Sequence, residues 1–220
     1  MRIAPDLDGM TKLCRLANRV GREINGRPDM CVLMSAALLD VLAKLGIPAE
    51  PLRVTAGVHC SKSRHRREWH GVVLGSDGAG ERLPKASVGA WYGHLVVIVL
   101  GRYLLDATLD QANKHPWLRA EPFAAEINPE EFLSGKKSLF TTTGKYGSTV
   151  CYSVFHHQKG FRNAPDFRFR SHRRDIVLEI LRSSEMPEKP NIVESIRSLL
   201  IDRYKCEILH IELVNRTKIY

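Results

Sequence analysis

Three residues have the side chains that an activated cysteine nucleophile needs, and helices and strands could bring them together. Cys31 opens a long apolar segment, His94 begins an aliphatic run, and Asp106 lies near the end of the run that follows. In such a system a thiolate attacks a carbonyl carbon, a histidine moves the proton, and a carboxylate fixes the imidazole tautomer. The set predicts acyl chemistry with Cys31 as nucleophile, His94 as general base and acid, and Asp106 as orienting group.

Each residue alone has an ordinary structural explanation. A cysteine in an apolar helix is usually a small buried hydrophobic residue, so Cys31 can be packing material. A single histidine such as His94 is usually a hydrogen-bonded structural residue, and Asp106 can start a turn through its side chain. The ordered set of a helix-opening cysteine, a strand histidine and an aspartate on the next strand favours catalysis.

Two helices precede the histidine. The first is predicted to begin at a capping Asp8 and to end near Gly26 and Pro28, because apolar residues recur at helical spacing at Leu13, Leu16, Ala17, Val20 and Ile24. The second, Cys31–Leu45, has so few polar residues that nearly its whole circumference is apolar, which predicts a buried central helix. The first turn of a helix favours a thiolate and can bind an oxyanion, which suits a nucleophile at Cys31.

The clearest sheet pattern is an antiparallel hairpin of His94–Leu100 and Tyr103–Ala107. A two-residue loop would turn Asp106 and His94 to opposite faces. A three-residue loop centred on Gly101 would place Asp106 opposite Val96, diagonal to His94 on one face. The catalytic hypothesis therefore requires a loop of odd length or a bulge, which Gly101 accommodates.

Further elements complete an α+β prediction in which a buried helix packs on an antiparallel sheet. The expected strands are Leu52–Thr55, Trp69–Leu74, Thr149–Phe155 and Glu207–Val214, and the expected helices are Pro129–Leu133, Arg173–Ser184 and Asn191–Tyr204. We expect a core domain over residues 1–160 and a helical and strand extension over residues 161–220 that packs on it.

Composition indicates a cytoplasmic protein with reduced thiols. The five cysteines form no CxxC pair, and 220 residues suffice for a core without disulfides. The first twenty residues carry charges throughout, unlike a secretory signal, and the longest apolar run, Leu95–Leu100, is too short to span a membrane. Sequence does not predict the oligomeric state.

A net charge of +9 supports a second hypothesis from a different class. A non-catalytic binding module could use basic stretches at residues 62–67 and 168–174 on an anionic partner such as nucleic acid. A zinc site is disfavoured because its potential ligands fit no zinc spacing and basic residues separate them, namely His59, Cys60, His65 and His70. No metal or cofactor is predicted.

Two sequence segments resemble the transglutaminase-like superfamily of papain-type cysteine enzymes. They are CVLMSAALLDVLAKLGIPAEPLRV, residues 31–54, and GHLVVIVLGRYLLDATLDQ, residues 93–111. The resemblance implies a papain-like core in which Cys31, His94 and Asp106 form the triad, and a peptide, isopeptide, amide or ester substrate. The hairpin is also similar to that of arylamine N-acetyltransferases, although the arginine and paired glycines that precede their cysteine are absent here.

Asn25 lies six residues before Cys31, the spacing at which papain-like peptidases place an oxyanion-hole amide. By that resemblance Asn25 is a candidate oxyanion-hole residue. An asparagine that simply ends a helix is the alternative explanation.

Overall fold

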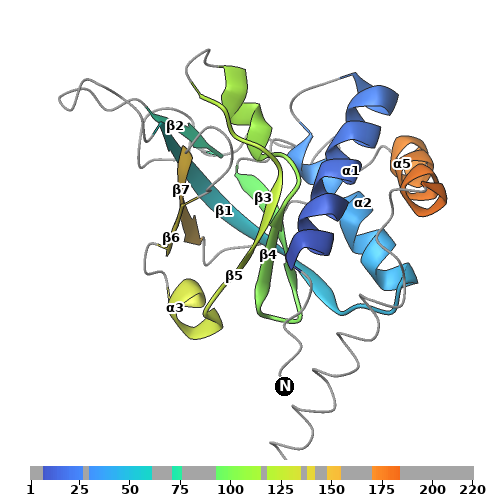
Figure 1. The fold of residues 1–220 in the computed structure, drawn as a ribbon. Coiled ribbons are helices and arrows are strands. Elements are labelled where there is room, and N and C mark those ends of the chain that lie inside the picture. Colours follow the sequence, from blue (N-terminus) through green and yellow to red (C-terminus); the bar gives the residue numbers. More distant parts are fainter. Residues whose placement is uncertain are drawn as a thin grey trace, which may run out of the picture.

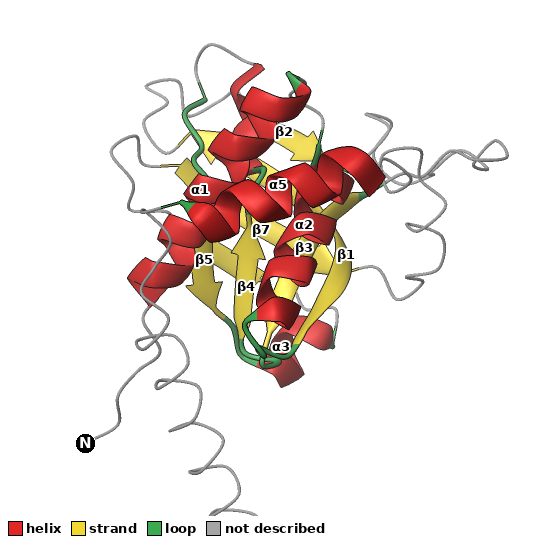
Figure 2. Ribbon diagram, turned by 90° about the vertical axis from the view of Figure 1, so that its right-hand side faces the viewer, coloured by secondary structure: helices red, strands yellow, loops and turns green. Residues whose placement is uncertain are grey.

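The structure, a computed structural model, combines helices with an antiparallel sheet that has seven strands among the residues described, an α+β fold (Figure 1). It describes residues 7–26, 30–60, 71–75, 93–114, 118–134, 138–141, 148–154 and 170–183. Helices α1, α2 and α5 lie together on one side of the sheet (Figure 2). Among the helices of these ranges, none has the length and apolar character needed to cross a membrane.

Helix α1 (Leu7–Asn25) buries one face, as its apolar spacing predicts. The predicted cap at Asp8 is wrong because the helix already includes Leu7, which puts Asp8 inside the first turn. There its carboxylate pairs with Lys12 at 2.7 Å. A negative charge in the first turn still favours the helix through the positive end of the macrodipole. Gly26, at a φ of 64°, follows the last helical residue.

Helix α2 (Cys31–Lys44) is buried along most of its length, as its apolar composition predicts. It ends at Lys44, one residue earlier than expected, and Leu45 is the residue that caps it. Gly46 then adopts a φ of 74°, a left-handed conformation that glycine enters without a steric penalty. The helix packs between its neighbours α1 and α5 and the sheet, so Cys31 is carried on a rigid, buried element.

Helix α5 (Arg170–Arg182) begins three residues before the predicted helix at 173–184. Its buried side chains Ile176, Val177 and Ile180 join the same hydrophobic cluster as α1 and α2. Arg173 pairs with Asp40 of α2 at 3.0 Å, so part of the basic stretch 168–174 is engaged within the fold. The helix and strand predicted at 191–204 and 207–214 lie outside the described residues.

The sheet has the strand order β5-β4-β3-β1-β7-β6, with β2 also paired to β1. Its strands are β1 (Ala49–Cys60), β2 (Gly71–Leu74), β3 (His94–Val99), β4 (Tyr103–Asp106), β5 (Phe123–Glu126), β6 (Ser138–Thr141) and β7 (Ser148–Val154). Strand β1 pairs with β7 along one edge. Its other edge is shared, since Val54 pairs with His94 of β3 and Ala56 pairs with Leu74 of β2.

Several elements differ from the prediction. The predicted strand Leu52–Thr55 is too short, because β1 continues through His59 and Cys60. Pairing on both edges holds this segment extended despite Gly57, which weakens a strand in isolation. Strands β5 and β6 and the 3-10 helix η1 (Leu109–Lys114) were not predicted, because each is too short to show a period.

Helix α3 (Pro129–Leu133) has the predicted bounds. Its side-chain cap is Asn128, whose Oδ1 accepts from the Glu130 backbone N–H at 3.1 Å. Strand β2 lies within the range predicted for it, and β7 begins one residue before its predicted start; residues 69, 70 and 155 of these two predictions lie outside the described residues.

The hairpin of β3 and β4 has the three-residue loop that the catalytic hypothesis requires. Val99 pairs with Tyr103 and Val97 pairs with Leu105, which leaves residues 100–102 as the loop. Its central Gly101 has a φ of 66°. The register therefore places Asp106 diagonally to His94 on one face of the sheet.

The two faces of the sheet carry separate hydrophobic clusters. Val97, Val99 and Leu105 face the helices, whereas alternate residues of the same strands, such as Val96 and Leu104, belong to a second cluster on the other face. Because side chains alternate along a strand, His94 and Asp106 lie on the same face of the sheet as the second cluster.

Candidate active site

The best-defined polar contact in the core joins His94 and Asp106. Their side chains are 1% and 0% exposed, and His94 Nε2 lies 2.8 Å from Asp106 Oδ2. The three-residue hairpin loop sets this contact by fixing which strand residues face each other. With Nε2 engaged by the carboxylate, Nδ1 is the ring nitrogen left for another partner.

The buried Asp106 carboxylate has donors on both oxygens. Oδ1 accepts from the Thr108 backbone N–H at 3.0 Å, and Oδ2 accepts from the Tyr152 hydroxyl at 2.8 Å as well as facing His94. A buried charge is tolerated only with such partners. The Thr108 contact spans two residues, so Asp106 starts a turn and holds the histidine at the same time.

Helix α2 brings Cys31 to this histidine. The Cys31 side chain hydrogen-bonds to that of His94 and is itself half-buried. One turn further along α2, Ser35 Oγ donates to the Leu95 carbonyl oxygen at 2.8 Å, which fastens the helix beside the first residues of β3. The three residues selected from the sequence therefore converge in the order thiol, imidazole, carboxylate.

The N-terminus of α2 leaves backbone donors beside the thiol. Met30 precedes the helix and makes no side-chain cap hydrogen bond to the first turn. The amides of residues 31–33 therefore lack the cap that many helices supply at this position. Backbone N–H groups at such a terminus suit a developing negative charge on an oxygen near Cys31.

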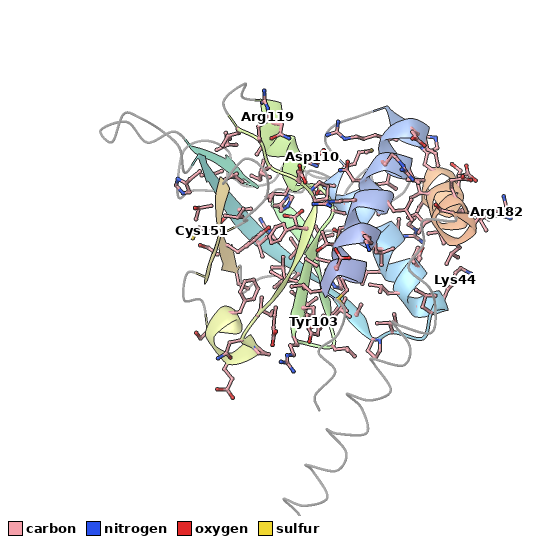
Figure 3. All side chains as sticks on the ribbon, in the orientation of Figure 1. Lys44, Tyr103, Asp110, Arg119, Cys151 and Arg182 are labelled. Carbon is pink, nitrogen blue, oxygen red and sulfur yellow. The ribbon has the colours of Figure 1, made fainter. Side chains whose placement is uncertain are left out.

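The segment after Asp106 is clamped to helix α1. Asn18 Nδ2 donates to the Ala107 carbonyl at 2.7 Å and to Asp110 Oδ1 at 2.9 Å. Arg22 pairs with the other oxygen of Asp110. Figure 3 shows Asp110, a residue of η1, on the side of the green segment that is next to α1. These contacts fix the chain immediately beyond the carboxylate that orients the histidine.

The electrostatic surroundings favour a charged His94. Burial lowers the pKa of the imidazole, but the nearby charge and hydrogen bond of Asp106, together with the Cys31 side chain, outweigh burial and raise the pKa to about 10. The imidazole is therefore protonated at neutral pH, and as an imidazolium it can stabilise a thiolate on Cys31.

We expect the stability of the protein to fall between about pH 6.5 and pH 10. His94 keeps its proton in the folded state up to about pH 10, whereas an unfolded histidine loses it near 6.5, so raising the pH removes this stabilisation. The slope approaches about 1.4 kcal/mol per pH unit for one proton. Urea unfolding at several pH values measures it. His94→Gln should lose this component, His59→Gln should retain it, and equal slopes in all three proteins would contradict the charged pair.

Gly75 lies so close to the backbone of His94 that a residue with a side chain would not fit in its place. Gly75 follows β2 and has a φ of 82°. Strands β2 and β3 pair with successive parts of the same edge of β1, and Gly75 lies where the two strands meet. A Cβ at this position would lie 2.3 Å from the His94 nitrogen and 2.6 Å from the Gly93 carbonyl carbon. Because both atoms are backbone, no rotamer change can relieve the contact.

Gly75→Ala should therefore displace His94, whereas Gly101→Ala should not. Both glycines have positive φ, but a Cβ at Gly101 meets nothing within 4 Å. We expect Gly101→Ala to cost about 1 kcal/mol of unfolding free energy through backbone conformation alone. Gly75→Ala should cost more and return the His94 pKa towards its ordinary value, measured by an NMR titration of the imidazole. An unshifted titration in Gly75→Ala would refute the steric argument.

The remaining predicted site residue, Asn25, is the last residue of α1 and is half-buried. Residues 27–29, which join it to the cysteine helix, lie outside the described residues. Its part in an oxyanion hole stays a prediction. Of the potential zinc ligands, His59 and Cys60 lie in β1, and His65 and His70 fall outside the described ranges together with the basic stretch 62–67. Over the residues that are described, no three His, Cys, Asp or Glu side chains gather as a metal site.

Tyr152 and the Thr108 amide were not identified from the sequence. A turn-forming contact two residues after an aspartate has a local signal, since Asp side chains often bond the backbone at that spacing. Tyr152 has none, because its contact with Asp106 joins residues 46 apart in the chain. Only the pairing of β7 with β1 brings it there.

The other described thiols lack a histidine partner of this kind. Cys14 is fully buried in α1, and burial, followed by the Asp106 charge, raises its pKa, which keeps it a neutral thiol. Cys151 is half-buried on β7, well away from α1 and α2 (Figure 3).

Comparisons of the chain with family models, with curated proteins and with solved structures find no match.

Proposed function

We propose that the protein carries out cysteine-dependent acyl chemistry through an acyl-enzyme on Cys31. The observation that carries the proposal is the buried His94 imidazole, held by Asp106 at 2.8 Å and hydrogen-bonded to the thiol that opens α2. A nucleophile beside a base, with the base oriented by a third group, is the arrangement that activates cysteine nucleophiles. The substrate class is an amide, peptide, isopeptide or ester.

In the first half of the reaction, the Cys31 thiolate attacks the carbonyl carbon and forms the C–S bond. Negative charge develops on the carbonyl oxygen, and the backbone N–H groups at the N-terminus of α2 would stabilise it by donating hydrogen bonds. The tetrahedral intermediate then collapses, the bond to the leaving amine or alcohol breaks, and His94 gives that group its proton. Asp106 keeps its contact with Nε2 throughout and holds the imidazole in place.

In the second half, water or an acceptor amine attacks the thioester. His94, now neutral, takes the proton of the attacking group, and the C–S bond breaks to release the acid or the transferred acyl product. The thiolate and imidazolium are thereby restored. Hydrolysis and acyl transfer differ only in the second nucleophile, so the triad serves both.

The packing of a buried cysteine helix on an antiparallel sheet also supports the papain-like core implied by the sequence resemblance. In that arrangement the helix N-terminus and a strand meet at the reacting atoms, as α2 and β3 do through Ser35 and Leu95. Helix α5 would then be an addition on the far side of the cysteine helix, joined through Arg173 and Asp40.

The direct test is to trap the acyl-enzyme with p-nitrophenyl acetate. Attack by Cys31 would release p-nitrophenolate in a rapid burst of about one equivalent and leave an acetyl group on the sulfur. Absorbance follows the burst, and mass spectrometry of the quenched protein locates the acetyl group.

A further inference from the structure

Tyr152 is a fully buried side chain whose hydroxyl reaches the catalytic pair. It donates at 2.8 Å to Asp106 Oδ2, the same oxygen that faces His94 Nε2. We propose that Tyr152 is a positioning residue that holds the Asp106 carboxylate in place and aimed at His94. This inference rests on the function proposed above and adds a fourth side chain to it.

The contact crosses the sheet rather than running along one strand pair. Asp106 is on β4 and Tyr152 on β7, and β3 and β1 lie between those strands. In a flat sheet three strand spacings would separate them by about 14 Å. The sheet must therefore curl to bring them together, and tyrosine combines the required length with a hydrogen-bond donor. A shorter hydroxyl residue on β7 would not reach.

Packing holds the Tyr152 ring beside the carboxylate. Its ring centroid lies 6.3 Å from that of Phe123, and Phe123 is the β5 residue paired with Asp106. Burial, followed by the charge and hydrogen bond of Asp106, raises the pKa of Tyr152 well above its usual value. The phenol therefore stays protonated, so its hydroxyl acts as a donor throughout the pH range in which the thiol would react.

Removing the hydroxyl would leave Asp106 Oδ2 with the His94 contact, while Oδ1 keeps the Thr108 amide. A carboxylate with one donor fewer is held less firmly towards His94, which weakens its support of the imidazolium. The thiolate depends most on that imidazolium at low pH. The loss should therefore appear as slower alkylation at the acidic end of the pH range.

The test compares Tyr152→Phe with Tyr103→Phe. Tyr103 is equally buried, but its hydroxyl has no hydrogen-bond partner among the described residues, so it controls for loss of a buried phenol. The rate of Cys31 alkylation by iodoacetamide is measured between about pH 5 and pH 9, with urea unfolding as a check on folding. The acid limb is the part of the rate–pH profile in which the alkylation rate falls as the pH is lowered. We expect its midpoint to shift to higher pH by about one unit in Tyr152→Phe and to stay in place in Tyr103→Phe.

A double-mutant cycle with Asp106→Asn separates positioning from a general effect on the fold. If Tyr152 acts through Asp106, Tyr152→Phe should have no further effect on alkylation in the Asp106→Asn background. A fluorinated tyrosine at position 152 keeps the donor and strengthens it, so its acid limb should lie at or below that of the wild type. This variant carries the test if Tyr152→Phe does not fold.

The outcomes also distinguish the inference from the proposed function. Rapid Cys31 alkylation in the wild type with an unshifted limb in Tyr152→Phe would overturn the role of Tyr152 and leave the acyl chemistry standing. Equal effects of Tyr152→Phe in both backgrounds, or a limb raised by the fluorinated tyrosine, would also overturn it. Wild-type Cys31 that reacts no faster than Cys151 would end both proposals.

Discussion

Cys31→Ala should abolish the burst of p-nitrophenolate and the acetylated form of the protein. The variant lacks the sulfur that forms the thioester, and no other described thiol hydrogen-bonds to a buried, charged histidine. The expected loss is therefore complete rather than partial. Absorbance at the burst and intact mass after quenching measure it.

Cys151→Ala is the matched control for this experiment. Cys151 has the same intermediate exposure as Cys31 but lies on β7. Its removal should leave the burst and the acetylated mass unchanged. An acetyl group found on Cys60 or Cys151, with Cys31 unmodified, would mean that Cys31 is packing material, and the basic binding module would then be the better hypothesis.

Asp106→Asn should slow alkylation of Cys31 by iodoacetamide on the order of 100-fold at pH 6, and much less at pH 9. Without the carboxylate charge, the raised pKa of His94 falls and the imidazolium that supports the thiolate is lost. An unsupported thiol ionises near pH 8.5, so at pH 6 only about one molecule in 300 is a thiolate. The effect shrinks as the pH approaches that value.

Asp110→Asn provides the comparison for Asp106→Asn. Asp110 is also a largely buried carboxylate, four residues later, but it contacts Asn18 and Arg22 of α1 instead of a histidine. Burial, only partly offset by Arg22 and Asn18, raises the pKa of Asp110. This substitution should leave the rate at pH 6 within about twofold of the wild type. Equal losses in the two variants would indicate damage to the fold rather than to the histidine.

The sequence predicted the parts of the site that depend on local patterns. The cysteine helix was found because an uninterrupted apolar segment ends at Gly46, and the hairpin because two β-rich runs flank Gly101. His94 and Asp106 could then be placed on one face of the sheet, because side chains alternate along each strand and a hairpin loop of odd length fixes which residues pair. These inferences needed no knowledge of the rest of the sheet.

What the sequence did not predict depends on contacts between distant segments. Strand β1 continues to Cys60 because β2 and β7 pair with it, and short strands such as β5 form only against an existing neighbour. The role of Gly75 arises from the approach of β2 to the start of β3, and that of Tyr152 from the curl of the sheet. None of these has a period or motif within its own segment.

The span of the Asp106 contacts also has a consequence for synthesis on the ribosome. His94 precedes Asp106 by 12 residues, but Tyr152 follows it by 46. At about 5 to 20 residues per second, the tyrosine is added roughly 2 to 9 seconds after the aspartate. Until β7 docks, the nascent chain lacks one donor to the charge that supports His94. We therefore expect the reactivity of Cys31 to rise by a further step during synthesis, when β7 joins the sheet and Tyr152 reaches Asp106.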